Sequence, residues 1–140
     1  MGKRRNGARS ALAFDFGLRW IGVATGQTQT HTATPRGKLA AKDGVPDWTA
    51  IGKLLETWQP DVVVVGLPLN MDGSDSEICR RARRFGHRVA GRFDCTVEFQ
   101  DERLSSREAH ERLPAGTAPS ESHQIAAQVI LEDWLAQQQR

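Results

Sequence analysis

A short run of apolar, mostly β-branched residues, Val62–Leu67, is the feature that most constrains how this 140-residue chain can fold. The run is continuous and does not alternate with polar residues, which predicts a β-strand buried on both faces. Pro60 lies before it and Pro68 directly after it, so the strand has defined ends. We therefore predict a central parallel strand in a sheet that helices cover on both sides.

The segments on either side of this run predict those helices. Apolar residues recur at helical spacing from Asp47 to Gln59, between a start signal at Pro46-Asp47 and a stop at Pro60. After the run and a polar loop at 68–75, apolar residues share one helical face from Ile78 to Val89. Helices before and after a buried strand are typical of α/β crossover connections.

The remaining segments complete the predicted sheet. Leu12–Asp15 and Ile21–Thr25 form a hairpin, Gln27–Gly44 holds one edge strand around Thr32 and a mobile connection, and Thr96–Phe99 is a strand. A short helix follows from Ser105 to Leu113, then a flexible loop over Pro114–Ser122, then a last helix from His123 to about Gln137. The fold class is α/β, a three-layer α/β/α domain with a mixed sheet.

Composition limits the class of protein. Hydrophobic residues are 39% and charged residues 26%, and no apolar run reaches the roughly 18 residues of a membrane span, so we expect a soluble chain with no membrane partner. Cys79 and Cys95 lack any spacing that suits zinc and say nothing about a bridge, so free thiols in a reducing cytoplasm are the simpler interpretation. We expect a flexible basic tail over residues 1–10 and one domain over 11–138, as a monomer or a homodimer.

Three carboxylates follow strands at the edge where parallel sheets collect functional groups. Asp15 ends the first strand, and Asp101 and Glu102 end a later one. Clustered carboxylates suit Mg²⁺ or Mn²⁺, which can polarise a phosphodiester and activate water. Each acid could instead be a turn or surface residue, although Asp15 lies between two phenylalanines, where an unpaired carboxylate would be unfavourable.

His123 is a further candidate, because it shares a helical face with apolar residues that should pack on the sheet. It is either a metal ligand or a structural histidine. Basic residues offer a grip for a polyanion, since six arginines lie within thirteen positions, Arg80, Arg81, Arg83, Arg84, Arg88 and Arg92. The alternative is a solvated helix face, and the net charge of +2 does not decide between the two.

Three segments resemble one family in order and spacing: Ala13–Ala24, Val65–Gly73 and Asp101–Ser105. Together they are similar to the YqgF family, RuvC-like members of the RNase H fold that are described as nucleases for the 5′ end of pre-16S ribosomal RNA. The resemblance extends from about Leu12 to Leu135.

The resemblance implies an endonuclease that depends on divalent metal, with Asp15 as the carboxylate of the first strand and Asp101 and Glu102 as further acids. Other motif positions that would orient substrate or support the metal are Arg19, Asn70, Asp72 and Arg103. Where the family has an aspartate at the start of the last helix, this sequence has His123, which can ligate Mn²⁺ or other transition metals. The loop 114–122 is also shorter and less basic than is usual in the family.

Several functions stay open at this point. The first is a metal-dependent nuclease for precursor ribosomal RNA, in which Asp15, Glu102 and His123 hold the metal and Arg80, Arg84 and Arg88 hold the strand. The second is a nuclease for branched DNA of the Holliday-junction type. The others are a non-catalytic RNA-binding module, in which His123 marks a degraded metal site, and an adaptor that acts through protein contacts.

Overall fold

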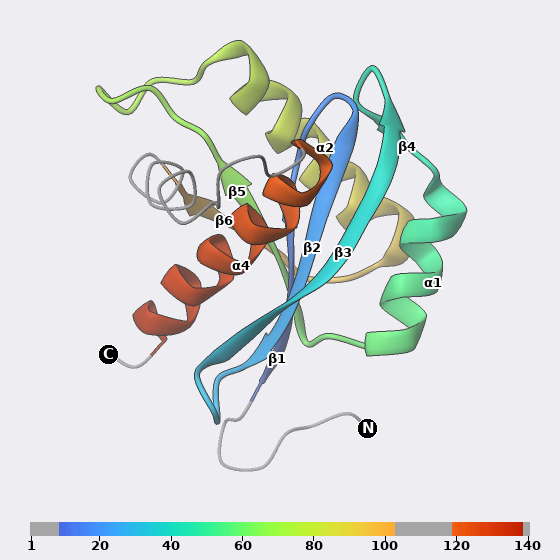
Figure 1. The fold of residues 1–140 in the computed structure, drawn as a ribbon, viewed down its shortest axis with the longest axis vertical. Helices are drawn as coiled ribbons and strands as arrows, with labels where there is room; N and C mark the ends of the chain where they lie inside the picture. The colour runs from blue at the N-terminus through green and yellow to red at the C-terminus, as the bar shows by residue number, and fades with distance from the viewer. Residues whose placement is uncertain (1–8, 103–118, 139–140) are drawn as a thin grey trace.

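The computed structural model describes residues 9–102 and 119–138, which form one six-stranded sheet and three helices (Figure 1). The strands are β1 (Ser10–Asp15), β2 (Trp20–Gln27), β3 (Thr32–Lys42), β4 (Val45–Pro46), β5 (Val62–Leu67) and β6 (Val97–Asp101). The helices are α1 (Trp48–Trp58), α2 (Glu77–Phe93) and α4 (Pro119–Gln137). None of the helices within these residues has the length and apolar character needed to cross a membrane.

The sheet is mixed and has the strand order β4-β3-β2-β1-β5-β6. β1 and β2 pair antiparallel, with Asp15 opposite Gly22, which confirms the predicted hairpin. β5 pairs parallel with both β1 and β6, and all of its residues are buried. The valine run is therefore the middle one of three parallel strands, next to the edge strand β6.

Strand alternation separates the core into two clusters, one on each face of the sheet. Leu12 and Val63 belong to the cluster that contains Ile51 of α1 and Phe85 of α2. Their neighbours Ala13 and Val64 belong to the cluster that contains residues of α4. Figure 1 shows the same division, with α4 in front of the sheet and α2 behind it. The predicted three-layer α/β/α architecture is confirmed.

The first residues of α4 pack unusually close to β2. A Cβ atom at Gly22 would lie 1.9 Å from the backbone oxygen of His123, so only glycine allows this approach. Near its other end, α4 is tied to β6 by Trp134, whose Nε1 donates to Oε1 of Glu98 at 2.8 Å. These contacts fix the position of the helix, and with it His123, over the ends of β1 and β2.

The two helices on the other face begin at capping residues, Asp47 for α1 and Ser76 for α2. Asp47 accepts a hydrogen bond from the backbone of Thr49 at 2.9 Å, and Gln59 ends α1 in the left-handed region at φ 44°, which confirms the predicted helix. The Oγ of Ser76 accepts from the backbone of Cys79 at 3.1 Å and begins α2. Both helices thus start and end through local side-chain and backbone chemistry.

Several boundaries differ from the prediction. The strand predicted around Thr32 is β3, which pairs with β2 and has β4 beside it only at Ala41 and Lys42, so among the described residues it has no outer partner over residues 32–40. The predicted mobile connection is wrong, because that segment is part of this strand. α4 begins at Pro119, so the end of the predicted loop 114–122 is helical. β1 begins at Ser10, which pairs with Gln27 of β2. The predicted short helix 105–113 and most of the basic tail lie outside the described residues.

Candidate active site

The three parallel strands end at one edge of the sheet, which is the upper edge in Figure 1. Asp15 is the last residue of β1, and Asp101 ends β6 opposite Leu67 of β5. The backbone N–H of Glu102 donates to the carbonyl of Leu67 at 3.1 Å, which holds Glu102 at the same edge. The topology therefore places acids from β1 and from the end of β6 on either side of β5.

Alternation along the strands decides which of these acids meet. Asp15 follows Ala11 and Ala13 on the face that α4 covers, and Glu102 lies on that face too, against Gly66. Asp101 is one residue earlier on β6, so its side chain is directed to the opposite face, and it is exposed. The structure brings Asp15 and Glu102 into one buried place and leaves Asp101 at its margin.

His123 of α4 joins this place through a direct contact with Asp15. Its Nδ1 lies 2.5 Å from Oδ2 of Asp15, and Asp15 is only 8% exposed. The hydrogen bond to Asp15 raises the pKa of His123, while partial burial opposes the rise. Burial raises the pKa of Asp15, and the hydrogen bond and charge of His123 act against it. The two side chains form a charge-assisted pair in a largely dry setting.

Glu102 is the second buried acid of the site, and its pKa is strongly raised. It is 5% exposed, and burial, followed by the charges of Asp15 and Asp101, raises its pKa to about 9. Gly66 makes room for it, because a Cβ there would lie 2.5 Å from Oε2 of Glu102. A buried carboxylate that repels its neighbours in this way is stabilised by any cation that enters. Gly66 is a functional position that the sequence prediction missed, and its one signal was a glycine inside the valine run.

The donor set suits a divalent cation, although the coordination sphere is not preassembled. Within residues 9–102 and 119–138, no group of three His, Cys, Asp or Glu side chains already has the arrangement of a metal site. Two buried carboxylates and an imidazole are nonetheless the ligand types that Mg²⁺ and Mn²⁺ accept. A cation bound here would replace the proton that the pair of His123 and Asp15 holds and offset the repulsion around Glu102.

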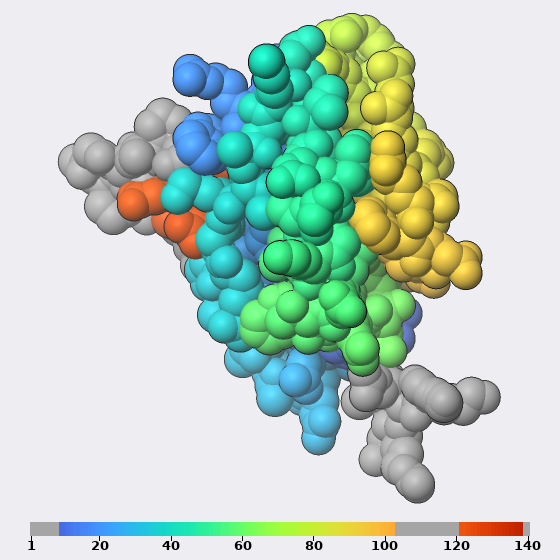
Figure 2. Space-filling view, turned by 90° about the vertical axis from the view of Figure 1, so that its right-hand side faces the viewer, coloured from blue at the N-terminus to red at the C-terminus, as the bar shows by residue number. Residues whose placement is uncertain are grey.

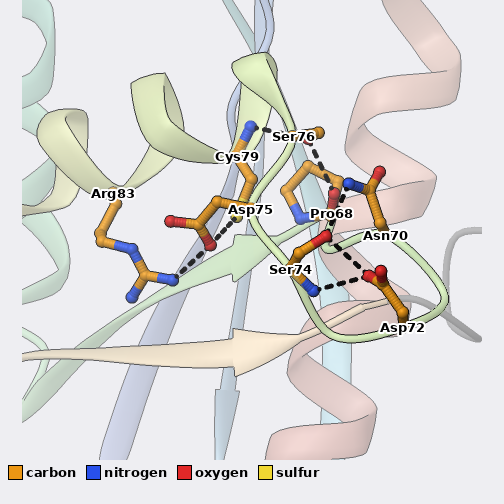
Figure 3. Close-up of polar contacts among 8 residues, drawn as sticks. All are labelled: Pro68, Asn70, Asp72, Ser74, Asp75, Ser76, Cys79 and Arg83. Atoms are coloured by element: carbon orange, nitrogen blue, oxygen red, sulfur yellow. Dashed lines mark hydrogen bonds and ion pairs between the residues drawn. The ribbon is translucent and has the colours of Figure 1, made fainter.

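The polar loop after β5 lies at the same edge and is organised by its own hydrogen bonds (Figure 3). The Nδ2 of Asn70 donates to Oγ of Ser74 at 3.0 Å, and that hydroxyl donates to Oδ1 of Asp72 at 2.6 Å. Ser76 continues the network by donating to the carbonyl of Pro68 at 3.1 Å. Asn70 and Asp72 thus lie in the loop after β5, where their hydrogen bonds with Ser74 shape the loop.

The predicted basic residues lie in two separate places, one at the edge of the sheet that carries the acids and one on the face opposite to α4. Arg19 is exposed in the turn between β1 and β2, and its carbonyl accepts from Ala41 at 2.8 Å, so it lies at the edge that carries the acids. Arg80, Arg84 and Arg88 lie on α2, which covers the face opposite to α4. Arg103 lies outside the described residues. The α2 arginines therefore lie on the other face of the sheet from Asp15 and Glu102.

Comparison with known proteins gives concordant results. Residues 9–137 match the model of the family described as "RuvX: Holliday junction resolvase". A protein of Nitrosococcus oceani named "Putative pre-16S rRNA nuclease" is 52% identical over 135 residues, which cover 94% of this chain and 89% of the relative. A protein of Marinobacter nauticus with the same name is 51% identical over 137 residues, covering 94% of this chain and 96% of the relative.

Solved structures share the fold at low sequence identity. Thermus thermophilus RuvC in complex with a Holliday junction substrate matches with a TM-score of 0.57 at 15% identity, covering 93% of this chain and 96% of that one. The yeast mitochondrial Holliday junction resolvase Ydc2 matches with a TM-score of 0.59 at 7% identity, covering 92% of this chain and 78% of that one. These likenesses show a RuvC-like fold of the RNase H class.

Proposed function

The chain belongs to the RuvX/YqgF family, and on this premise we propose that it is a metal-dependent endonuclease that processes the 5′ end of pre-16S ribosomal RNA in the cytoplasm. The names of its relatives support the substrate, since proteins about half identical along nearly the whole chain are named for this RNA. Membership of a nuclease family supports the reaction, which is hydrolysis of a phosphodiester bond.

One observation carries the proposal: two buried carboxylates and a histidine, from three separate elements, meet at the edge where the parallel strands end. Asp15 and Glu102 are 8% and 5% exposed, and His123 contacts Asp15. Burying acids close together is unfavourable for folding, because burial raises the pKa of both carboxyl groups and the charge of Asp15 raises that of Glu102 further. Such perturbation is typical of active sites.

Asp15, Glu102 and His123 would hold the metal, and Asp101 would add a further carboxylate at the exposed margin. A divalent cation such as Mg²⁺ or Mn²⁺ supplies Lewis acidity to the phosphodiester and lowers the pKa of the attacking water. The residues of the chain supply position: Asp15 is fixed by β1 and by its bond to His123, and Glu102 by its backbone bond to Leu67. Arg19, Asn70, Asp72 and Arg103 would orient the strand at this edge.

The second candidate is cleavage of branched DNA. It is favoured by the description of the family model, which names a Holliday junction resolvase. A symmetric four-way junction is best cut by a symmetric pair of active sites, so this function would require a homodimer. Cleavage of a single RNA end has no such requirement, and a monomer would suffice.

The test is cleavage of a 5′ fragment of pre-16S ribosomal RNA and of a four-way DNA junction, each with Mg²⁺ or Mn²⁺. Wild type is compared with Asp15→Asn, which removes a charge from the site. Asp47→Asn is the matched control, because it makes the same change on the other face and asparagine still caps α1.

We expect metal-dependent cutting of the RNA that disappears in Asp15→Asn and persists in Asp47→Asn. Cutting of the junction alone would establish the second candidate in its place. Absence of cutting by folded protein with either metal would overturn the nuclease and favour a non-catalytic RNA-binding module.

A further inference from the structure

Helix α2 carries a cluster of positive charges that lies on the other face of the sheet from Asp15 and Glu102. Over Glu77–Phe93 it has six arginines and one acid. Arg80, Arg84 and Arg88 follow one another at intervals of four residues, the spacing at which like charges face each other on a helix and destabilise it. A helix that keeps this arrangement on an exposed face would be stabilised by a bound polyanion.

Most of these arginines already have partners within the fold. Arg80 pairs with Glu77 at 2.8 Å, Arg83 with Asp75 at 2.9 Å and Arg81 with Asp43 at 3.4 Å. Arg92 lies over the ring of Trp48, with 4.3 Å between its Cζ and the ring centroid.

Arg84 and Arg88 are different. Both are exposed, and neither forms a salt bridge with an acid among residues 9–102 and 119–138. They therefore present two exposed guanidinium groups that form no ion pair with the described residues, although the charge of Arg84 contributes to the lowered pKa of Glu77.

These two residues stand between two adjoining hollows of the surface. One is a shallow hollow of about 420 Å³ that Arg84 and Arg88 line together with Arg80, Arg83 and His87. The other is smaller and lies towards the β3–β4 hairpin, where Trp48 and Arg81 also line it. Figure 2 shows α2, in yellow, along the flank of the molecule beside α1 in green and the hairpin in teal. The hollows provide a concave and basic surface on the face opposite to α4.

We propose that this surface, centred on Arg84 and Arg88, is a second nucleic-acid contact, which binds the phosphate backbone of the substrate away from the point of cleavage. Guanidinium groups bind phosphate oxygens in bidentate fashion. Four residues of helix rise about 6 Å, which is near the separation of neighbouring phosphates along a strand. The inference rests on the proposed function for the identity of the polyanion, and the chemistry recognised is a phosphodiester backbone.

The geometry adds a consequence for substrate size. The sheet lies between α2 and the side chains of Asp15 and Glu102, so one short strand cannot contact both surfaces. A substrate that reaches both must be folded or double-helical and must pass around the edge of the sheet. Recognition would then depend on the body of the substrate as well as on the cleaved segment.

The test is binding of the RNA fragment and of the DNA junction in EDTA, measured by fluorescence anisotropy over a series of salt concentrations. The variant is Arg84→Ala with Arg88→Ala, which replaces exposed helical residues with the best helix former and should fold. The matched control is Lys53→Glu on α1, which also lowers the net charge by two and is exposed. Each lost phosphate contact reduces the slope of the logarithm of the binding constant against the logarithm of the salt concentration by about 0.7–0.9. For the double variant we therefore expect this slope to be smaller by roughly 1.4–1.8, and binding to be about ten-fold weaker.

Equal weakening by Lys53→Glu, or no weakening by the double variant, would overturn the inference. Competition by polyglutamate as strong as that by RNA would also overturn it, because the surface would then be a general acidic-protein site. The stronger of the RNA and DNA arms identifies the source of the phosphates. Binding is measured without metal, so it can be judged separately from cleavage. If the protein binds through Arg84 and Arg88 but cuts neither substrate, the proposed nuclease activity is refuted and the proposed binding surface is still supported.

Discussion

Replacing Glu102 with glutamine should make the metal-free protein more stable at neutral pH. The pKa of Glu102 is about 9 in the folded protein and 4.5 in its ordinary setting. Between these values the unfolded chain releases a proton that the folded protein retains, so the free energy of unfolding falls as the pH rises. One proton corresponds to about 1.4 kcal/mol per pH unit, which gives roughly 2–3 kcal/mol between about pH 5.5 and 7.5.

The assay is urea denaturation in EDTA at several pH values across this window. We expect the slope of unfolding free energy against pH to be smaller by about one proton in Glu102→Gln than in wild type. Some slope will persist in the variant, because the raised pKa values of Asp15 and His123 have the same sign. Glu56→Gln, at an exposed position of α1, is the matched control and should keep the wild-type slope.

An identical slope in wild type and Glu102→Gln would refute the reasoning, since it would mean that Glu102 is ionised in the folded protein without penalty. Divalent metal offers an independent check at about pH 7.5. If the cation replaces the proton, Mg²⁺ or Mn²⁺ at one hundred times its Kd should stabilise wild type by about 2.7 kcal/mol. The same addition should have little effect on Glu102→Gln.

Three further predictions concern the packing and the ligands of the site. Gly22→Ala should destabilise the protein by about 3 kcal/mol or lower its yield, because the new methyl group would overlap the backbone of His123. Thermal denaturation compares this variant with Gly52→Ala, where the atom nearest to the new Cβ is 3.1 Å away. Gly66→Ala should weaken metal binding in calorimetric titration, since its Cβ displaces the carboxylate of Glu102. His123→Asp should raise the affinity for Mg²⁺ relative to Mn²⁺, because a carboxylate replaces an imidazole; an unchanged ratio in titrations with both metals would exclude His123 as a ligand.

Local patterns in the sequence determined much of the fold. The valine run predicted a strand buried on both faces, and Val62–Leu67 is one. The capping signal at Asp47 and the apolar spacing after it predicted α1. These features depend on burial and on helical periodicity, which are determined by short stretches of sequence and can therefore be predicted from it. The sequence also placed Asp15 and Glu102 at strand ends, where sheets collect functional groups.

Other features depended on contacts between distant segments. The strand β3 lacks a strong hydrophobic pattern, and its pairing with both β2 and β4 stabilises it where local propensity does not. Only the register of β6 shows that Glu102 turns towards Asp15 and that Asp101 turns away. Arg84 and Arg88 are close to the catalytic motifs in sequence, yet α2 packs on the core cluster that contains Phe85, on the other face of the sheet from Asp15 and Glu102.

The sequence by itself thus determined the elements, the family and the residue types of the site, because propensity, periodicity and motif spacing are local properties. The tertiary structure decided which of those residues meet. Gly22 and Gly66 illustrate the reason: as letters they are only breaks in two strands, and in the fold they are the spaces that admit the backbone of His123 and the carboxylate of Glu102. Distances between residues more than a hundred positions apart, such as Asp15 and His123, are set by how a helix packs on a sheet and not by either segment alone.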